Sequence, residues 1–178
     1  FLLLGSSSPA IVRRASESLT GRIAYLDLFP FSIHEVGPEN RERLWMRGGF
    51  PEAYLAGTDE EAFTLLTDHI RSFVERDLAE LGLGAAPENT HTLLRMLASV
   101  HGQPLNMSML GKSIGLSIPT IKLYMEFFVQ AGMVFRMLPW HVNIRKRLAK
   151  TPKVYLTDSG VLHALTGLRT PDQLWGHA

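Results

Sequence analysis

"LSIPTIKLYMEFFVQAGMV", residues 116–134, is the stretch that decides the fold of this 178-residue chain. At about 100° per residue, its apolar residues gather on one broad face, as expected of a helix packed against a core. That face consists of Ile118, Ile121, Tyr124, Met125, Phe128 and Val129. The stretch therefore predicts a helix that is fixed in a core along one side.

A helical pattern precedes this stretch, and two apolar runs follow it. "THTLLRMLASVHG" (90–102) predicts a first helix, and "NMSMLGKSIG" (106–115) predicts a short second one. "MVFRML" (133–138) and "KVYLTD" (153–158) predict two strands around a basic loop. Helix, short helix, turn, helix and two-stranded wing, in this order, predict a winged helix over residues 87–160.

The outward side of the decisive helix favours protein contact over base reading. Leu123 and Phe127 lie four residues apart, so they form a second apolar ridge away from the core. Base reading uses Arg, Lys, Asn and Gln, and Lys122 is the one cation on this side of the helix. Glu126 lies four residues further on, where we expect it to neutralise Lys122.

The loop that follows the helix, "NIRKRLAKTPK" (143–153), points to a different partner. It carries no carboxylate and five cations, which are Arg145, Lys146, Arg147, Lys150 and Lys153. Such a loop suits phosphate backbones and predicts salt-sensitive binding that is independent of base sequence. A solvated hairpin tip, or contact with an acidic protein surface, explains the same charges. With Lys122, these residues are the candidate DNA contacts.

The remaining sequence predicts a mostly α protein with little β structure. Residues 1–33 have the pattern of strand, helix and strand, and residues 34–86 are mostly helical, with Asp59 as a candidate helix cap. We expect residues 161–178 to be a linker to a further domain. The helical repeat of the second segment consists of Phe63, Leu66, Ile70, Phe73, Val74 and Leu78.

Composition excludes several classes of function. The chain has no cysteine, so it forms no disulfide and has no thiolate nucleophile. Its seven histidines show no metal-ligand spacing, and no catalytic residue set emerges from the sequence. A net charge of +1 requires any basic surface to be local. Apolar runs fall short of a membrane span, so we expect a cytoplasmic protein with no membrane contact.

Several motifs occur in an order that resembles a group of bacterial and archaeal AAA-type ATPases. They are "FLLLGSSS", "ESLTGR", "RGGFPEAY", "VERDL", "LNMSMLGKSIGLSIPTIKLYMEFF" and "NIRKRLAKTPKVYLTDSGV". The resemblance implies the α/β remnant of an ATPase core, a helical lid and a winged helix. It further implies that the P-loop and Walker B strand precede this piece, and that a nuclease-like domain follows it.

The resemblance also implies roles for particular residues. Ser6 and Ser7 match a strand end that senses the γ-phosphate, and Arg22 matches an arginine that approaches phosphate oxygens. Gly49 and Pro51 match a lid motif that packs a proline against adenine. The parent protein would bind ATP and magnesium, whereas this fragment would be inactive and bind neither.

Three functions follow from these observations. The first is the central part of an ATPase that couples nucleotide state to DNA or partner binding. The second is a winged helix that binds DNA without nucleotide, through the basic wing. The third is a winged helix that docks on protein, including a second copy of itself, through Leu123 and Phe127.

Overall fold

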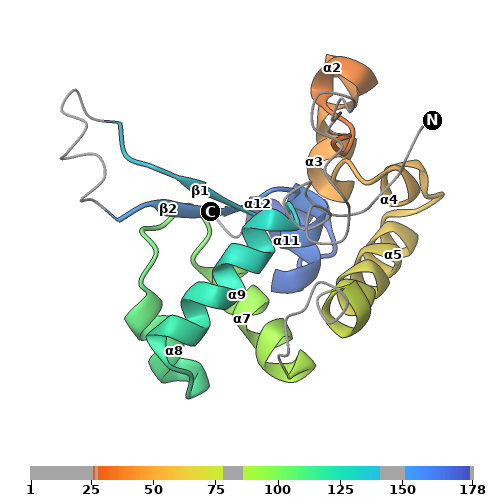
Figure 1. The fold of residues 1–178 in the computed structure, drawn as a ribbon. Helices are drawn as coiled ribbons and strands as arrows, with labels where there is room; N and C mark the ends of the chain where they lie inside the picture. The colour runs from red at the N-terminus through yellow and green to blue at the C-terminus, as the bar shows by residue number, and fades with distance from the viewer. Residues whose placement is uncertain (1–25, 27, 78–85, 141–150, 177–178) are drawn as a thin grey trace, which may run out of the picture.

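A computed structural model describes residues 26, 28–77, 86–140 and 151–176 (Figure 1). In these ranges the chain is mostly helical with one small antiparallel sheet, so the coarse fold class is confirmed. The strand, helix and strand expected over residues 1–33 fall outside the described residues for nearly all their length. The helical elements are α2 (Ile33–Val36), η1 (Pro38–Asn40), α3 (Arg41–Arg47), α4 (Pro51–Leu55), α5 (Asp59–Ser72), η2 (Phe73–Asp77), α7 (Pro87–Ser99), α8 (Met107–Ile114), α9 (Ile118–Gln130), α11 (Ser159–Thr166) and α12 (Pro171–Trp175).

The cap of helix α5 lies one residue earlier in the chain than expected. The hydroxyl of Thr58 caps the helix by accepting a hydrogen bond from the backbone N–H of Glu61, at 3.1 Å. The prediction that Asp59 is the cap was therefore wrong, because Asp59 already lies in the first turn and its carboxylate pairs with Arg47. The apolar repeat continues without a break into η2, a single π-helical turn.

Helices α7, α8 and α9 form at the three places that the sequence predicts. Asn106 caps α8 and Ser117 caps α9, each by accepting a backbone N–H from three residues further on. Of the predicted core face of α9, the buried members are Ile121, Tyr124, Met125 and Phe128. Ile118 is 51% exposed, because the first residue of the helix lies beyond the edge of the core.

The sheet consists of β1 (Val134–Met137) and β2 (Lys153–Leu156), paired antiparallel with Phe135 opposite Tyr155. A third segment, residues 102–105, lies along the other edge of β2. There the N–H of Gly102 donates to Val154 O at 2.7 Å, and the N–H of Val154 donates to Gln103 O at 3.1 Å. Figure 1 shows β1 and β2 projecting away from the helices.

One hydrophobic core joins the helices to the sheet. Burial of each large side chain stabilises the fold by about 2 kcal/mol. Helix α11 packs against α3, α5 and α7, so it bridges the elements before and after residue 86. Residues 161–176, which we expected to be a linker, lie mostly in α11 and α12. The largest fully buried side chains include Leu93, Leu94, Leu97, Leu110, Ile121, Met125, Phe128 and Val154.

Candidate nucleic-acid interface

The outward side of α9 presents one cation and a short apolar strip. Lys122 and Leu123 are exposed, and Leu123 has 51% of its surface accessible. Phe127 is half-buried and packs against the hydrophobic core, because the side of α9 that faces the core includes more residues than the four that are fully buried. What we call the apolar strip of α9 is therefore the pair Ile118 and Leu123. These two lie about 140° apart around the helix and do not make the full ridge that we expected.

Glu126 does not neutralise Lys122. Its two carboxylate oxygens accept hydrogen bonds from the two terminal nitrogens of Arg136, at 2.9 and 3.0 Å. Strand β1 follows α9 after a tight turn, which brings Arg136 back against the helix, and such paired contacts are stronger than a lysine point charge. Among the described residues, Lys122 takes part in none of the salt bridges.

The basic loop joins the ends of the paired strands. Lys153 is exposed at the start of β2, where it lies opposite Met137 of β1 and pairs with Pro104 on its other side. Arg145, Lys146, Arg147 and Lys150 lie outside the described residues. Because β1 and β2 are paired, this basic segment leaves from and returns to the same end of the sheet.

Charge is strongly segregated along the chain. Residues 106–156 contain eight Lys and Arg but a single carboxylate, Glu126. The rest of the chain contains ten Lys and Arg and sixteen Asp and Glu. The pair with Arg136 neutralises that one carboxylate, so the cations of this segment meet no opposing charge from within it. A net charge of +1 conceals a strongly basic segment, which the overall count in the sequence does not reveal.

The two predicted nucleotide-site residues that the structure describes, Gly49 and Pro51, lie at a different place and have structural explanations. Gly49 is buried, and its N–H donates to a carboxylate oxygen of Asp158 at 2.7 Å. A Cβ at Gly49 would overlap the backbone of Phe31, so only glycine permits this approach. Pro51 is the exposed first residue of α4, a position that suits proline.

Asp158 holds this region together, and the sequence analysis missed it. One of its carboxylate oxygens caps α11 by accepting the N–H of Val161 at 2.9 Å, while the other accepts the N–H of Gly49. An aspartate just before a short apolar run was the available signal for the cap. Its bond to Gly49 joins residues 109 positions apart, which local pattern does not predict.

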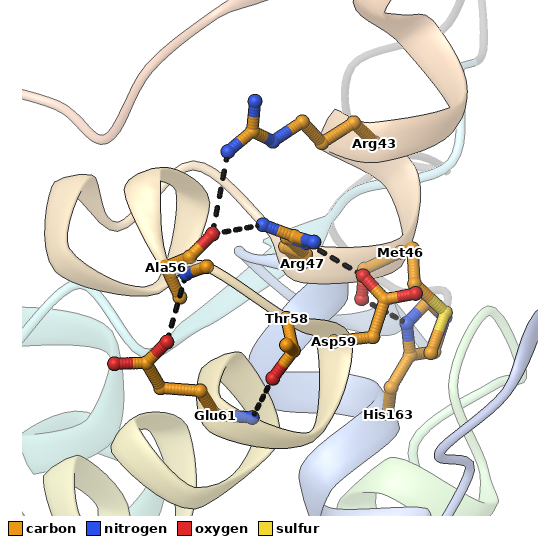
Figure 2. Close-up of polar contacts among 9 residues, drawn as sticks. Arg43, Met46, Arg47, Ala56, Thr58, Asp59, Glu61 and His163 are labelled. Atoms are coloured by element: carbon orange, nitrogen blue, oxygen red, sulfur yellow. Dashed lines mark hydrogen bonds and ion pairs between the residues drawn. The ribbon is translucent and has the colours of Figure 1, made fainter.

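Next to Asp158, polar groups of α3, α5 and α11 satisfy one another (Figure 2). Arg47 binds the Asp59 carboxylate at 2.6 Å and donates to the carbonyl of Ala56, while the ring nitrogen Nδ1 of His163 lies 3.1 Å from Met46 O. Burial lowers the pKa of His163, against the smaller opposing effects of the Met46 carbonyl and Asp158. The cavity here measures about 10 Å³, space for at most one water molecule, so this junction is structural.

A shallow surface cavity of about 360 Å³ lies beside this junction. Phe50, Pro51, Leu65 and His69 line it together with neighbouring residues of α4 and α5. In the parts of the chain that the structure describes, no three His, Asp or Glu side chains gather as a metal site would require. Within the same ranges, no helix combines the length and the apolar character that crossing a membrane demands.

Comparison with known proteins identifies relatives of unknown function. Residues 38–172 match the family described as "Domain of unknown function (DUF8612)". The chain is 38% identical over 168 residues to uncharacterised proteins of Mycobacterium bovis and Mycobacterium tuberculosis. Each alignment covers 94% of this chain but 38% of the relative, so the chain spans well under half of their length. No solved structure gives a significant match.

The assignment to the AAA-type ATPases was therefore wrong. The matching family and relatives carry no ATPase description, and the described residues give no positive sign of an ATPase fragment. Each motif behind the resemblance is short, and packing accounts for Gly49 and Pro51. Ser6, Ser7 and Arg22 lie outside the described residues, and the expected ATP and magnesium rested on this resemblance alone. By the match over residues 38–172, the chain belongs to the DUF8612 family.

Proposed function

We propose that residues 87–160 form a winged helix that binds nucleic acid through phosphate contacts from its basic hairpin. The observation that carries this proposal is the segregation of charge in residues 106–156, where eight cations oppose one paired carboxylate. Polyanionic backbones are the natural partner of such a segment, because every neutralised phosphate releases counterions and adds to affinity.

The order of elements supports the winged-helix part of the proposal. Helices α7, α8 and α9 are followed by the hairpin β1–β2, and the segment after α7 pairs with the free edge of β2. Three extended segments beside three helices match the module that the sequence predicts. In this proposal α9 has the role of the recognition helix, and the β1–β2 hairpin has the role of the wing.

Helix α9 contributes a phosphate contact in this proposal and little base reading. Lys122 is exposed and unopposed, because Glu126 is held by Arg136. Its neighbours Ile118 and Leu123 are apolar and offer no hydrogen bond to a base edge. Binding is therefore expected to be strong at low salt and tolerant of sequence.

A salt titration of the 178-residue chain with a labelled duplex tests this function. Fluorescence anisotropy at about 50 and about 200 mM salt gives the slope of log affinity against log salt. Arg145→Gln with Arg147→Gln should flatten that slope by about 2, because each lost phosphate contact removes about 0.9. Arg41→Gln with Arg76→Gln, both on exposed side chains of the acidic helical part, is the matched control and should leave the slope unchanged.

Two results would overturn the proposal. One is the absence of binding to both duplex and single-stranded nucleic acid at low salt. The other is an equally flattened salt slope in the two double variants, which would show that net charge, and not the basic loop, determines binding.

A second candidate is protein docking through α9, which the half-exposed Ile118 and Leu123 favour. A partner protein, or a second copy of the chain, would cover this apolar strip. The strip is narrow because Phe127 packs against the core, so we rank this function behind nucleic-acid binding.

A further inference from the structure

The outer face of the β1–β2 hairpin is apolar, aromatic and cationic. Side chains alternate along both strands, and the buried ones are Val134, Val154 and Leu156. The opposite face presents Phe135, which is 52% exposed, and Met137, which is 46% exposed. The residues directly opposite these two are Tyr155 and Lys153, so an aromatic pair lies next to an apolar–cation pair.

The aromatic character extends to both sides of the strand pair. His101 packs edge-on against Tyr155, with ring centroids 5.1 Å apart and planes at 85°. Beyond the end of β1, Leu138 is 51% exposed and Trp140 is 81% exposed. Gly102 lies beside the Tyr155 ring without a side chain to cover it. Within the described residues, this face therefore presents the exposed ring of Phe135 opposite the half-buried ring of Tyr155.

We infer that this face binds single-stranded nucleic acid, with unpaired bases stacked on Phe135 and Tyr155 and a phosphate held by Lys153. The inference rests on the proposed function and names the form of nucleic acid that the hairpin takes. It goes beyond that function, since phosphate contacts alone do not distinguish a duplex from a single strand.

Charge complementarity favours a polyanion over a protein as the occupant. The only carboxylate of residues 106–156 is Glu126, and its partner Arg136 alternates with Phe135 and Met137, away from the outer face. Rings together with unopposed cations are the composition of single-strand sites, where aromatic side chains stack on bases and lysine or arginine follows the backbone. An apolar protein surface would leave the exposed Lys153 without a partner.

The accessible ring faces favour unpaired bases over a duplex. A base stacks on a ring only when one of its faces is free, whereas bases inside a duplex are already stacked on both faces. Tyr155 is held in place by its contact with His101, whose Nδ1 accepts the N–H of Leu156 at 3.1 Å. Phe135 lies directly opposite Tyr155 in the sheet, so the two residues offer stacking for adjacent bases.

Anisotropy titration of the 178-residue chain with oligothymidine and with a duplex of equal length tests this inference. Phe135→Ala should weaken binding of the single strand on the order of 10-fold and leave duplex binding within about twofold, because stacking on an aromatic ring is lost. Phe135→Leu keeps an apolar side chain without a ring and should show the same selective loss. Trp175→Ala, at a residue that is 67% exposed on α12, is the matched control and should change neither affinity.

Four outcomes would overturn the inference. Phe135→Leu binding the single strand as tightly as the unmodified chain would show that no ring stacking occurs. Equal losses for single strand and duplex would show a general effect of the variant, with circular dichroism checking that each variant is folded. Unchanged nucleic-acid binding with altered sedimentation would assign the face to protein. Duplex binding without single-strand binding would contradict this inference but leave the proposed function standing. In the same way, a chain that binds neither duplex nor single strand would contradict both.

Discussion

The helical part of residues 34–105 and the segment of residues 106–156 use their charged groups in opposite ways. The first has twelve Asp and Glu against six Lys and Arg, and its Arg47 is paired with Asp59 inside the fold. The second has eight Lys and Arg against one carboxylate, and that carboxylate is held by Arg136. Polar groups that find partners within the chain stabilise it, whereas unpartnered cations are available for a ligand.

This difference separates two kinds of unusual residue. Gly49 and Pro51, which the sequence marks as a site, are explained by a close backbone approach and by a helix start. Among the described residues, Lys122, Lys153 and the exposed Phe135 have no such internal explanation. We therefore place stability in the junction of α3, α5 and α11, and binding in the hairpin.

The largest expected effect is a loss of stability from a substitution in the junction that leaves the hairpin unchanged. Asp158→Ala removes the acceptor for two buried N–H groups, those of Gly49 and Val161, and should lower the free energy of unfolding by about 3 kcal/mol. Urea denaturation followed by circular dichroism measures the loss. Asp68→Ala, at an exposed position of α5, is the control and should change stability by less than about 0.5 kcal/mol.

The same variant tests whether the two regions are independent. Below its unfolding transition, Asp158→Ala should bind duplex with the salt slope of the unmodified chain, because none of the proposed phosphate contacts changes. A slope that changes with the junction would show that the regions are coupled, and the separation of stability from binding would fail.

A second, smaller effect weakens the basic segment without touching the core. Lys122→Gln with Lys153→Gln should lower duplex affinity about 10-fold at low salt and flatten the salt slope by about 2, since both side chains are exposed. Stability should stay within about 0.5 kcal/mol. Lys112→Gln, at an exposed position of α8, removes a cation of the same segment from another helix and serves as the comparison. An equal loss of duplex affinity in this variant would show that the binding surface is broader than proposed.

The sequence predicts which residues are buried in the core far better than it predicts contacts between residues that are distant in sequence. The helical period of α9 correctly places Ile121, Met125 and Phe128 in the core, because one face of a helix is set by local spacing alone. The prediction that Glu126 pairs with Lys122 was wrong. Lys122 is near in sequence, but the turn between α9 and β1 brings Arg136 next to Glu126. The bond from Gly49 to Asp158 likewise depends on how α3 and α11 pack.

The candidate site shows the same division. The basic loop and Lys122 could be named from the sequence, because charge is visible there. The outer face of the hairpin could not, since it depends on the pairing of Phe135 with Tyr155 and on the ring of His101 beside it. Strand register decides which side chains share a face, and a shift of one residue would have turned these rings toward the core.

A smaller effect still is expected from pH, and it should arise in the junction. His163 is buried and its pKa is lowered from 6.5, chiefly by burial, so the folded state favours the neutral ring. As pH falls through about 6.5, the ordinary pKa of histidine, the unfolded chain takes up a proton that the folded chain resists, so stability declines on the acid side of neutral pH. Urea denaturation at several pH values measures this decline.

Substitution of the ring identifies its source. His163→Gln keeps a donor for Met46 O and should reduce the pH dependence, whereas His34→Gln, at an exposed position of α2, should leave it unchanged. A pH dependence that persists in His163→Gln would move its origin to other groups. Burial also lowers the pKa of His91 and His101, which makes these two the next to replace.

The smallest expected effect decides between the two candidate functions of α9. Leu123→Ser removes half-exposed apolar surface outside the core, so stability should change by less than about 0.5 kcal/mol and duplex affinity by less than about twofold. Sedimentation velocity of this variant and of Leu55→Ser, at a residue that is 65% exposed on α4, compares their self-association. If Leu123→Ser alone dissociates an oligomer of the unmodified chain, α9 docks on protein, and the hairpin then has to bind nucleic acid without it. If neither variant changes sedimentation, the apolar strip of α9 is ordinary surface, and binding rests on the cations and rings that follow the helix.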